Sequence, residues 1–106
     1  MLIDRTKAYV QVFNNCDIDT LENFFHQDVA LFDPANDSGI FGKENVLSMI
    51  RDLFNKQIEF VANNIFLDGN HTIIEFSLSI DNQSLKGVDI IEWHNEKIKV
   101  LRAYLY

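Results

Sequence analysis

Apolar side chains recur at helical spacing over the first 25 residues. From residue 3 to residue 13 they predict an amphipathic helix whose inner face holds Ile3, Thr6 by its methyl group, Tyr9, Val10 and Phe13. A second, short helix is predicted next, with an apolar face made of Leu21, Phe24 and Phe25. Asp17 or Asp19 can cap this helix, Asp19 with Glu22 as its partner in a capping box.

The following apolar segment has the period of a strand. Side chains alternate in residues 28–33, so that Val29, Leu31 and Asp33 lie on one side, and the strand is predicted to end at Pro34. Residues 35–41 are expected to form a loop. After Gly42 the helical period returns and predicts a third helix with an apolar stripe of Val46, Ile50, Leu53 and Phe54.

Beyond Lys56 the chain is rich in Ile, Phe and Val and predicts three or four strands. Turn-forming residues at 68–70, 81–83 and 95–96 separate the strands and are typical of hairpins. The pattern predicts an α+β fold in which three N-terminal helices pack on one face of a curved, mostly antiparallel sheet. A length of 106 residues predicts one domain spanning residues 1–106.

The charge of the chain argues against several partners. Sixteen acidic and nine basic residues give a net charge of −7, which repels nucleic-acid backbones and anionic membranes, so we expect neither as a partner. The charged N-terminal segment does not suit a signal peptide, and no apolar run reaches the roughly 20 residues of a membrane span. We therefore expect a cytoplasmic protein. The lone Cys16 cannot form an internal disulfide and is expected to be buried or half-buried.

Motifs of metal, acyl-transfer and nucleotide chemistry are missing from the sequence. His26, His71 and His94 are scattered, so we expect no metal site. The chain has neither the GxSxG turn of serine hydrolases nor the GxxxxGK[ST] loop that binds phosphates.

Asp89 is an unexpected polar residue in the strand-like segment 85–93. Alternation places it on the more apolar face of this segment, with Leu85, Gly87, Ile91 and Trp93. An ionised carboxylate buried there without a partner would cost several kcal/mol, so the group is expected to keep its proton or to meet a hydrogen-bond donor. The alternatives are an edge position, or an ion pair with a base such as Lys86 or Arg102.

Tyr9 and Asp33 also admit two interpretations each. The ring of Tyr9 lies on the apolar stripe of the first helix, where it either packs in the core or turns its hydroxyl toward a polar partner. Asp33 precedes a proline and can be a turn-former that accepts local backbone hydrogen bonds.

Together these residues resemble the bacterial ketosteroid isomerases, which belong to the cone-shaped superfamily of nuclear transport factor 2-like and SnoaL-like folds. The resemblance covers nearly the whole chain, through Tyr9, the turn Cys16-Asp17-Ile18-Asp19, the pair Asp33-Pro34, Gly42 and Asp89. The closing segment KVLRAYL is also similar, with pocket-facing positions at Leu101, Ala103 and Leu105. Two further tyrosines of that family are replaced here, by Phe25 and Ile50.

The resemblance implies a cone-shaped fold and an isomerase that shifts a double bond by cofactor-free proton transfer on a small hydrophobic carbonyl compound. Asp33 would be the base, and Tyr9 and a protonated Asp89 would donate hydrogen bonds to the dienolate oxygen. The apolar residues that would contact the ligand are Phe25, Phe32, Phe54, Phe76, Ile91, Trp93 and Leu101.

The same fold leaves two alternative functions open. One is a non-catalytic module for binding a small ligand or for dimerisation, and the other is a SnoaL-like cyclase or dehydratase that uses one aspartate as acid and base. A homodimer is expected in either case, because an apolar outer face of the sheet would need cover at Val88, Ile90, Val100 and Tyr104.

Overall fold

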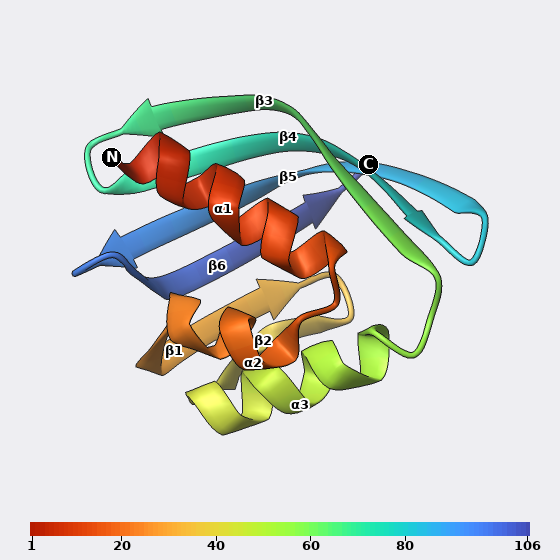
Figure 1. The fold of residues 1–106 in the computed structure, drawn as a ribbon, viewed down its shortest axis with the longest axis horizontal. Coiled ribbons are helices and arrows are strands. Elements are labelled where there is room, and N and C mark those ends of the chain that lie inside the picture. The colour runs from red at the N-terminus through yellow and green to blue at the C-terminus, as the bar shows by residue number, and fades with distance from the viewer.

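The computed structural model describes residues 1–106 as helices packed on one sheet (Figure 1). The helices are α1 (Leu2–Asn14), α2 (Ile18–Leu21) and α3 (Lys43–Leu53), and a short 3₁₀ turn, η1 (Glu22–Phe24), follows α2. The strands are β1 (Phe25–Asp33), β2 (Asn36–Phe41), β3 (Ile58–Asp68), β4 (His71–Ile80), β5 (Gln83–His94) and β6 (Lys97–Leu105). Their order in the sheet is β2-β1-β6-β5-β4-β3, and only β1 and β6 are parallel neighbours.

The helices cover one face of this sheet. Figure 1 shows α1 crossing the long strands while α3 lies beside β1 and β2, and α1 makes its sheet contacts mainly with β3. Sixteen apolar side chains are buried between the two layers. The predicted α+β fold, with helices on a curved and mostly antiparallel sheet, is confirmed.

The edge strand β2 corrects the expectation of a loop at residues 35–41. The chain turns back at Pro34 and Ala35, and β2 then pairs with β1 through Leu31–Ile40 and Ala30–Phe41. The sequence of β2 does not alternate regularly between apolar and polar residues. The pairing register shifts near its start, and Gly39 has a φ of +96°, which is not an extended-strand value. The hydrogen bonds of β1, rather than local propensity, make this segment a strand.

The connection between α1 and α2 also differs from expectation. Cys16 is exposed because it lies in the turn after α1, where its φ of 53° places it in the left-handed region. Asp17 caps α2, and its Oδ1 accepts a hydrogen bond from the Thr20 backbone N–H at 3.1 Å. The alternative capping box with Asp19 does not form.

The hairpin turns of the meander are confirmed. Asp81 and Asn82 join β4 to β5 with φ values of 49° and 70°, and Asn95 and Glu96 join β5 to β6 with φ values of 50° and 61°. Positive φ at both central residues is the geometry of a two-residue turn that matches strand twist. β4 and β5 pair without a register shift, whereas the antiparallel pairing of β5 with β6 shifts between Glu92 and Trp93.

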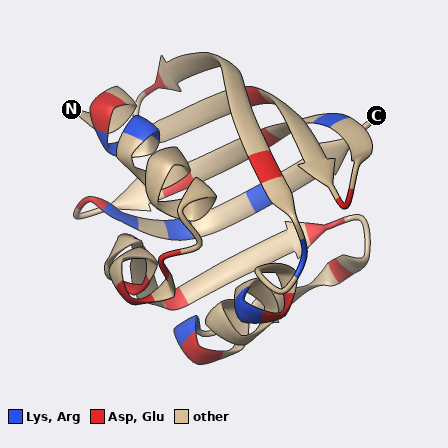
Figure 2. Ribbon diagram, turned by 45° about the vertical axis from the view of Figure 1, so that its right-hand side comes forward, with Lys and Arg blue, Asp and Glu red and all other residues tan.

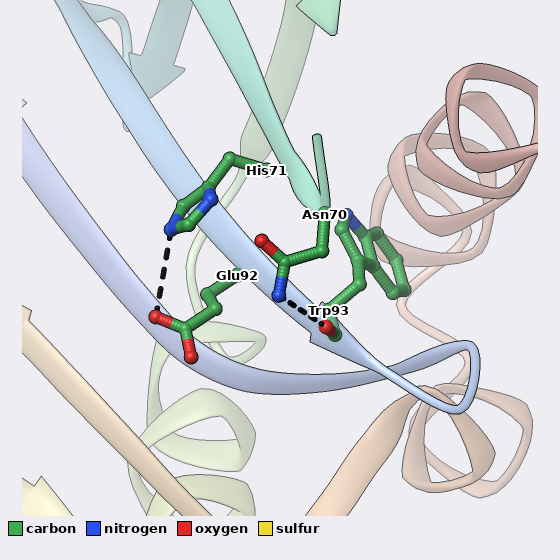
Figure 3. Close-up of polar contacts among 4 residues, drawn as sticks. All are labelled: Asn70, His71, Glu92 and Trp93. Carbon is green, nitrogen blue, oxygen red and sulfur yellow. Dashed lines mark hydrogen bonds and ion pairs between the residues drawn. The ribbon is translucent and has the colours of Figure 1, made fainter. Parts of the chain in front are cut away.

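Polar contacts join β4 and β5 near the β3–β4 turn. Asn70 Nδ2 donates a hydrogen bond to the Trp93 carbonyl oxygen at 3.3 Å, and His71 Nε2 lies 3.5 Å from Glu92 Oε1 (Figure 3). Behind them, the indole N–H of Trp93 donates to Thr72 Oγ1 at 2.8 Å, and that hydroxyl pairs with Thr6 of α1 at 2.9 Å. Thr6, Thr72 and Trp93 are buried, so the core fills the interior at this sealed end of the sheet.

Charged residues are distributed over the helices, strands and turns (Figure 2). Red acidic positions outnumber blue basic ones, in accord with the net charge of −7. None of the helices combines the length and the apolar character needed to cross a membrane.

Candidate active site

A cavity of about 320 Å³ lies between the helices and the inner face of the sheet. Pro34 and Ala35 lie at its open end, where β1 ends, together with Leu105 at the end of β6. The wall is almost entirely apolar, and its only polar side chains are Tyr9, Asp33 and Asp89. The structure thus brings together, from α1, β1 and β5, the three residues for which the resemblance implies catalytic roles.

Asp89 lies deep in this cavity. It occupies an interior strand, flanked by Ile74 on β4 and Ala103 on β6, and its side chain is only 6% exposed. Neither alternative arrangement occurs, because β5 is not an edge strand, and Lys86 and Arg102 lie at positions of the opposite face. With no ion pair to stabilise its charge, burial raises the pKa of Asp89 from 3.8 to about 7.

Tyr9 reaches the cavity from α1. Its side chain is 5% exposed, and its ring contacts three phenylalanines, with centroid separations of 6.2 Å to Phe13, 6.0 Å to Phe24 and 6.2 Å to Phe25. Burial, and to a smaller extent the charge of Asp89, raise the pKa of the Tyr9 hydroxyl far above its usual value. The phenol therefore remains a hydrogen-bond donor over the whole working pH range.

Asp33 is a turn-former that also lines the cavity. Its Oδ1 accepts hydrogen bonds from the Asn36 backbone N–H at 2.7 Å and from Asn36 Nδ2 at 3.0 Å, which is the contact of a turn-former. The same half-buried side chain also lines the cavity. Because both bonds from Asn36 go to Oδ1, the other carboxylate oxygen is not engaged by that residue.

Asp33 and Asp89 lie on one cross-sheet row. The parallel pair Leu31–Leu101 precedes Asp33 and Ala103 by two residues on their strands, and Ala103 is in turn the partner of Asp89. Strands are spaced about 4.8 Å apart, so the two acidic residues stand roughly 10 Å apart along the sheet with a small side chain between them. A compact ligand can span that interval.

The model of the SnoaL-like domain matches residues 6–101 of the chain. The protein belongs to the SnoaL-like family. No curated protein matches the sequence of this SnoaL-like protein.

Solved structures with the same fold match nearly the whole length of this SnoaL-like chain. An NTF2-like protein of unknown function from Cytophaga hutchinsonii has a TM-score of 0.89 at 11% identity and covers 100% of this chain and 90% of its own. A proposed ketosteroid isomerase from Kribbella flavida has a TM-score of 0.88 at 14% identity, covering 97% and 76%. An LEH-like epoxide hydrolase from M. tuberculosis has a TM-score of 0.87 at 18% identity, covering 98% and 81%. At these identities the likeness shows the fold alone.

The apolar wall of the SnoaL-like cavity differs from the predicted one. Of the seven residues expected to contact a ligand, only Phe76 and Leu101 line the cavity. Phe32 points to the other face of the sheet and packs against Phe41 at a centroid separation of 5.9 Å. Phe54 follows α3 and lies against Phe13 at 5.2 Å, outside the lining.

The other three expected wall residues, Phe25, Ile91 and Trp93, are fully buried in the core and do not reach the cavity. Trp93 is held at the sealed end by its bond to Thr72. Strand alternation identifies the face on which such residues lie, but their position along the strand decides whether they meet the cavity or the core.

Several wall residues of the SnoaL-like protein were not identified from the sequence as ligand contacts. They continue the inward positions of α3, β3, β4 and β5, and are Met49, Leu53, Phe60, Leu78, Ile80 and Leu85. The signal was present in the periodicity of each element. Periodicity does not show where the open end of the cone lies, and these positions are on the side of that end.

Proposed function

We propose that this SnoaL-like protein is an isomerase that transfers a proton within a small, uncharged, hydrophobic carbonyl compound. The observation that carries the proposal is that Tyr9, Asp33 and Asp89 supply all of the polar side chains of one apolar cavity. A few polar side chains that converge in an otherwise apolar pocket are typical of a binding or active site. The proposed setting is cytoplasmic, in keeping with the absence of a membrane-spanning helix.

Asp33 is the base in this proposal. Its carboxylate takes a proton from the carbon next to the carbonyl group, and the electrons of that C–H bond move to form a dienolate. Two hydrogen bonds from Asn36 to Oδ1 fix the orientation of the carboxylate. The same Asp33 then returns the proton at the far carbon of the dienolate, so the double bond moves and no cofactor is consumed.

Tyr9 and Asp89 stabilise the dienolate oxygen. The phenol O–H donates one hydrogen bond, and Asp89 donates a second as long as its carboxyl group is protonated. A pKa of about 7 for Asp89 supports this role, because the buried group still holds its proton at mildly acidic pH. The two donors act where the carbonyl oxygen gains charge, which lowers the barrier to proton removal.

A non-catalytic binding module is the second candidate. It is favoured by the surroundings of Tyr9, whose aromatic contacts are all phenylalanines, including Phe25 at a position where the resembled isomerases carry a tyrosine. Ile50 stands at the other such position. Without a hydrogen-bonded partner, the phenol is a weaker acid and a less effective donor to an oxyanion.

Turnover separates the two candidates. A cavity of about 320 Å³ is at the small end of the range for ligand pockets. Two substrates are therefore assayed, the small ketone 3-cyclohexen-1-one and a β,γ-unsaturated ketosteroid. Conjugated-enone absorbance should grow with enzyme concentration for at least one of them. Retention of the ketone without any enone at every pH would reject the isomerase and leave the binding module.

A homodimer through the outer face of the sheet is part of the proposal. Val88 and Tyr104 are cross-strand partners on that face, and Ile90 lies two residues along the same strand from Val88. Tyr104 is 53% exposed, and Phe41 and Phe66 also expose more than half of their surface. Exposed apolar side chains on a sheet face are suited to contact with a second copy of the chain.

A further inference from the structure

The cavity holds acidic groups and no basic ones. Among its lining residues there is no Lys, Arg or His, whereas Asp33 and Asp89 both face the interior. The lining residues from α3, β3, β4 and β6 are apolar. Asp33 of β1 and Tyr9 of α1 are therefore the titratable groups that share the cavity with Asp89. The charged neighbours in sequence, Lys86 and Arg102, lie at outer-face positions of the sheet.

Asp89 has no partner within the protein. Its side chain is only 6% exposed, and it forms no ion pair. Every polar side-chain atom that is fully inaccessible in this protein has a hydrogen-bond partner. The carboxyl oxygens must therefore have access to the cavity. A buried carboxyl group that has no partner and lines an apolar cavity favours a ligand that supplies a hydrogen-bond donor or a positive charge.

We infer that the cavity also binds compact hydrophobic amines as ammonium cations, with Asp89 as the counter-charge. This ligand class is chemically distinct from a neutral carbonyl compound, and its binding does not depend on turnover. The rings of Tyr9, Phe13, Phe60 and Phe76 line the same space and suit a cation flanked by apolar groups. The net charge of −7 attracts cations to the protein and repels anions.

Protonation of Asp89 controls which class is bound. Below a pKa of about 7 the carboxyl group is neutral and donates a hydrogen bond to an uncharged acceptor. Above that pH it is ionised and attracts an ammonium group in a site of low dielectric. An alkylamine keeps its own proton up to about pH 10, so the ligand stays charged throughout this range.

Three probes of similar shape and different charge test the inference: 1-adamantylamine, 1-adamantanol and 1-adamantanecarboxylate. Dissociation constants are measured by calorimetry on the wild-type protein from pH 5.5 to pH 8.5. The amine should bind at least about tenfold more tightly than the alcohol at pH 8.5, and the carboxylate should bind most weakly. Ionisation of one group with a pKa of about 7 allows the amine affinity to rise by up to about 30-fold across the series, while that of the alcohol does not rise.

The variant Asp89→Asn should bring the amine and the alcohol to similar affinity and abolish the rise with pH. Asp52→Asn is the matched control, because it removes an equal charge from an exposed position of α3 outside the cavity and should keep the preference. Equal or tighter binding of the alcohol at pH 8.5 overturns the inference, as does a preference that survives Asp89→Asn. The wild-type pH series decides the matter by itself if that variant does not fold.

Discussion

Asp33 and Asp89 face the same cavity from strands β1 and β5, but their carboxyl groups have opposite surroundings. Asp33 lies at the open end and accepts two hydrogen bonds from Asn36 on one oxygen. Asp89 lies among apolar side chains without an ion pair, and burial raises its pKa to about 7. Two residues of the same type therefore differ in burial and in hydrogen bonding within one cavity.

Stability should fall as pH rises from about 4 to about 7. The pKa of Asp89 is raised in the folded protein from 3.8 to about 7, so over this range the folded state binds a proton that the unfolded state has released. The shift corresponds to a loss on the order of 4 kcal/mol, complete above pH 7. Urea denaturation at several pH values measures it, and Asp89→Asn should flatten the decline. A decline of the same size in Asp89→Asn would contradict the assignment to this group.

Asp33→Asn should abolish most of the proposed isomerase activity. An amide cannot accept the substrate proton, and loss of a positioned base lowers kcat by roughly 10²–10⁴-fold. KM should change little, because the shape and the apolar wall of the cavity are kept. Enone absorbance gives both constants, and Asp37→Asn on the exposed edge strand β2 is the control for the loss of one charge. An unchanged kcat in Asp33→Asn would remove Asp33 as the base.

Tyr9→Phe should reduce kcat without unfolding the protein. The ring contacts with Phe13, Phe24 and Phe25 persist, and only a hydroxyl that lines the cavity is lost. Removal of one donor to an oxyanion costs about 10²–10³-fold in rate. Thermal denaturation checks the fold, and Tyr106→Phe, at a 79% exposed position, is the matched control. Full activity of Tyr9→Phe would mean that the phenol does not contact the reacting oxygen.

Gly87→Ala should destabilise the sheet beside the cavity. A Cβ at this position would lie 2.1 Å from the Tyr104 carbonyl oxygen and 2.9 Å from the Phe76 ring. Overpacking of this kind costs about 1–3 kcal/mol or more, since backbone atoms must move. Gly69→Ala is the comparison, because no atom lies within 4 Å of its Cβ and only the strain of a φ of +60° applies, about 1 kcal/mol. Equal losses in urea denaturation would show that β5 and β6 tolerate the contact.

Ile90→Glu should convert the proposed homodimer into a monomer. Ile90 lies at the centre of the outer sheet face, paired with Ile73 and Arg102, and a carboxylate there would be desolvated in a dimer. Sedimentation velocity measures the change. Ser48→Glu adds the same charge on an exposed position of α3 and should leave the dimer intact. A wild-type protein that sediments as a monomer at micromolar concentration would reject this interface.

The sequence by itself determined which face of each element is apolar. The helical stripe that includes Tyr9, the alternation that turns Asp89 inward and the turn at Asp81 and Asn82 all follow from local rules, and the structure reproduces them. These features depend on residues close together in the chain, so periodicity and turn chemistry suffice to predict them.

Only the tertiary structure decided what those faces meet. The parallel pairing of β1 with β6 brings Asp33 beside Ala103 and within two strands of Asp89, although 55 residues separate the two aspartates in the sequence. Pairing with β1 makes residues 36–41 the strand β2, and neither ion pair of the structure includes Asp89. Alternation fixes the side of a strand on which a residue lies, but strand order and the open end of the cone arise from contacts between distant segments, which no local pattern encodes.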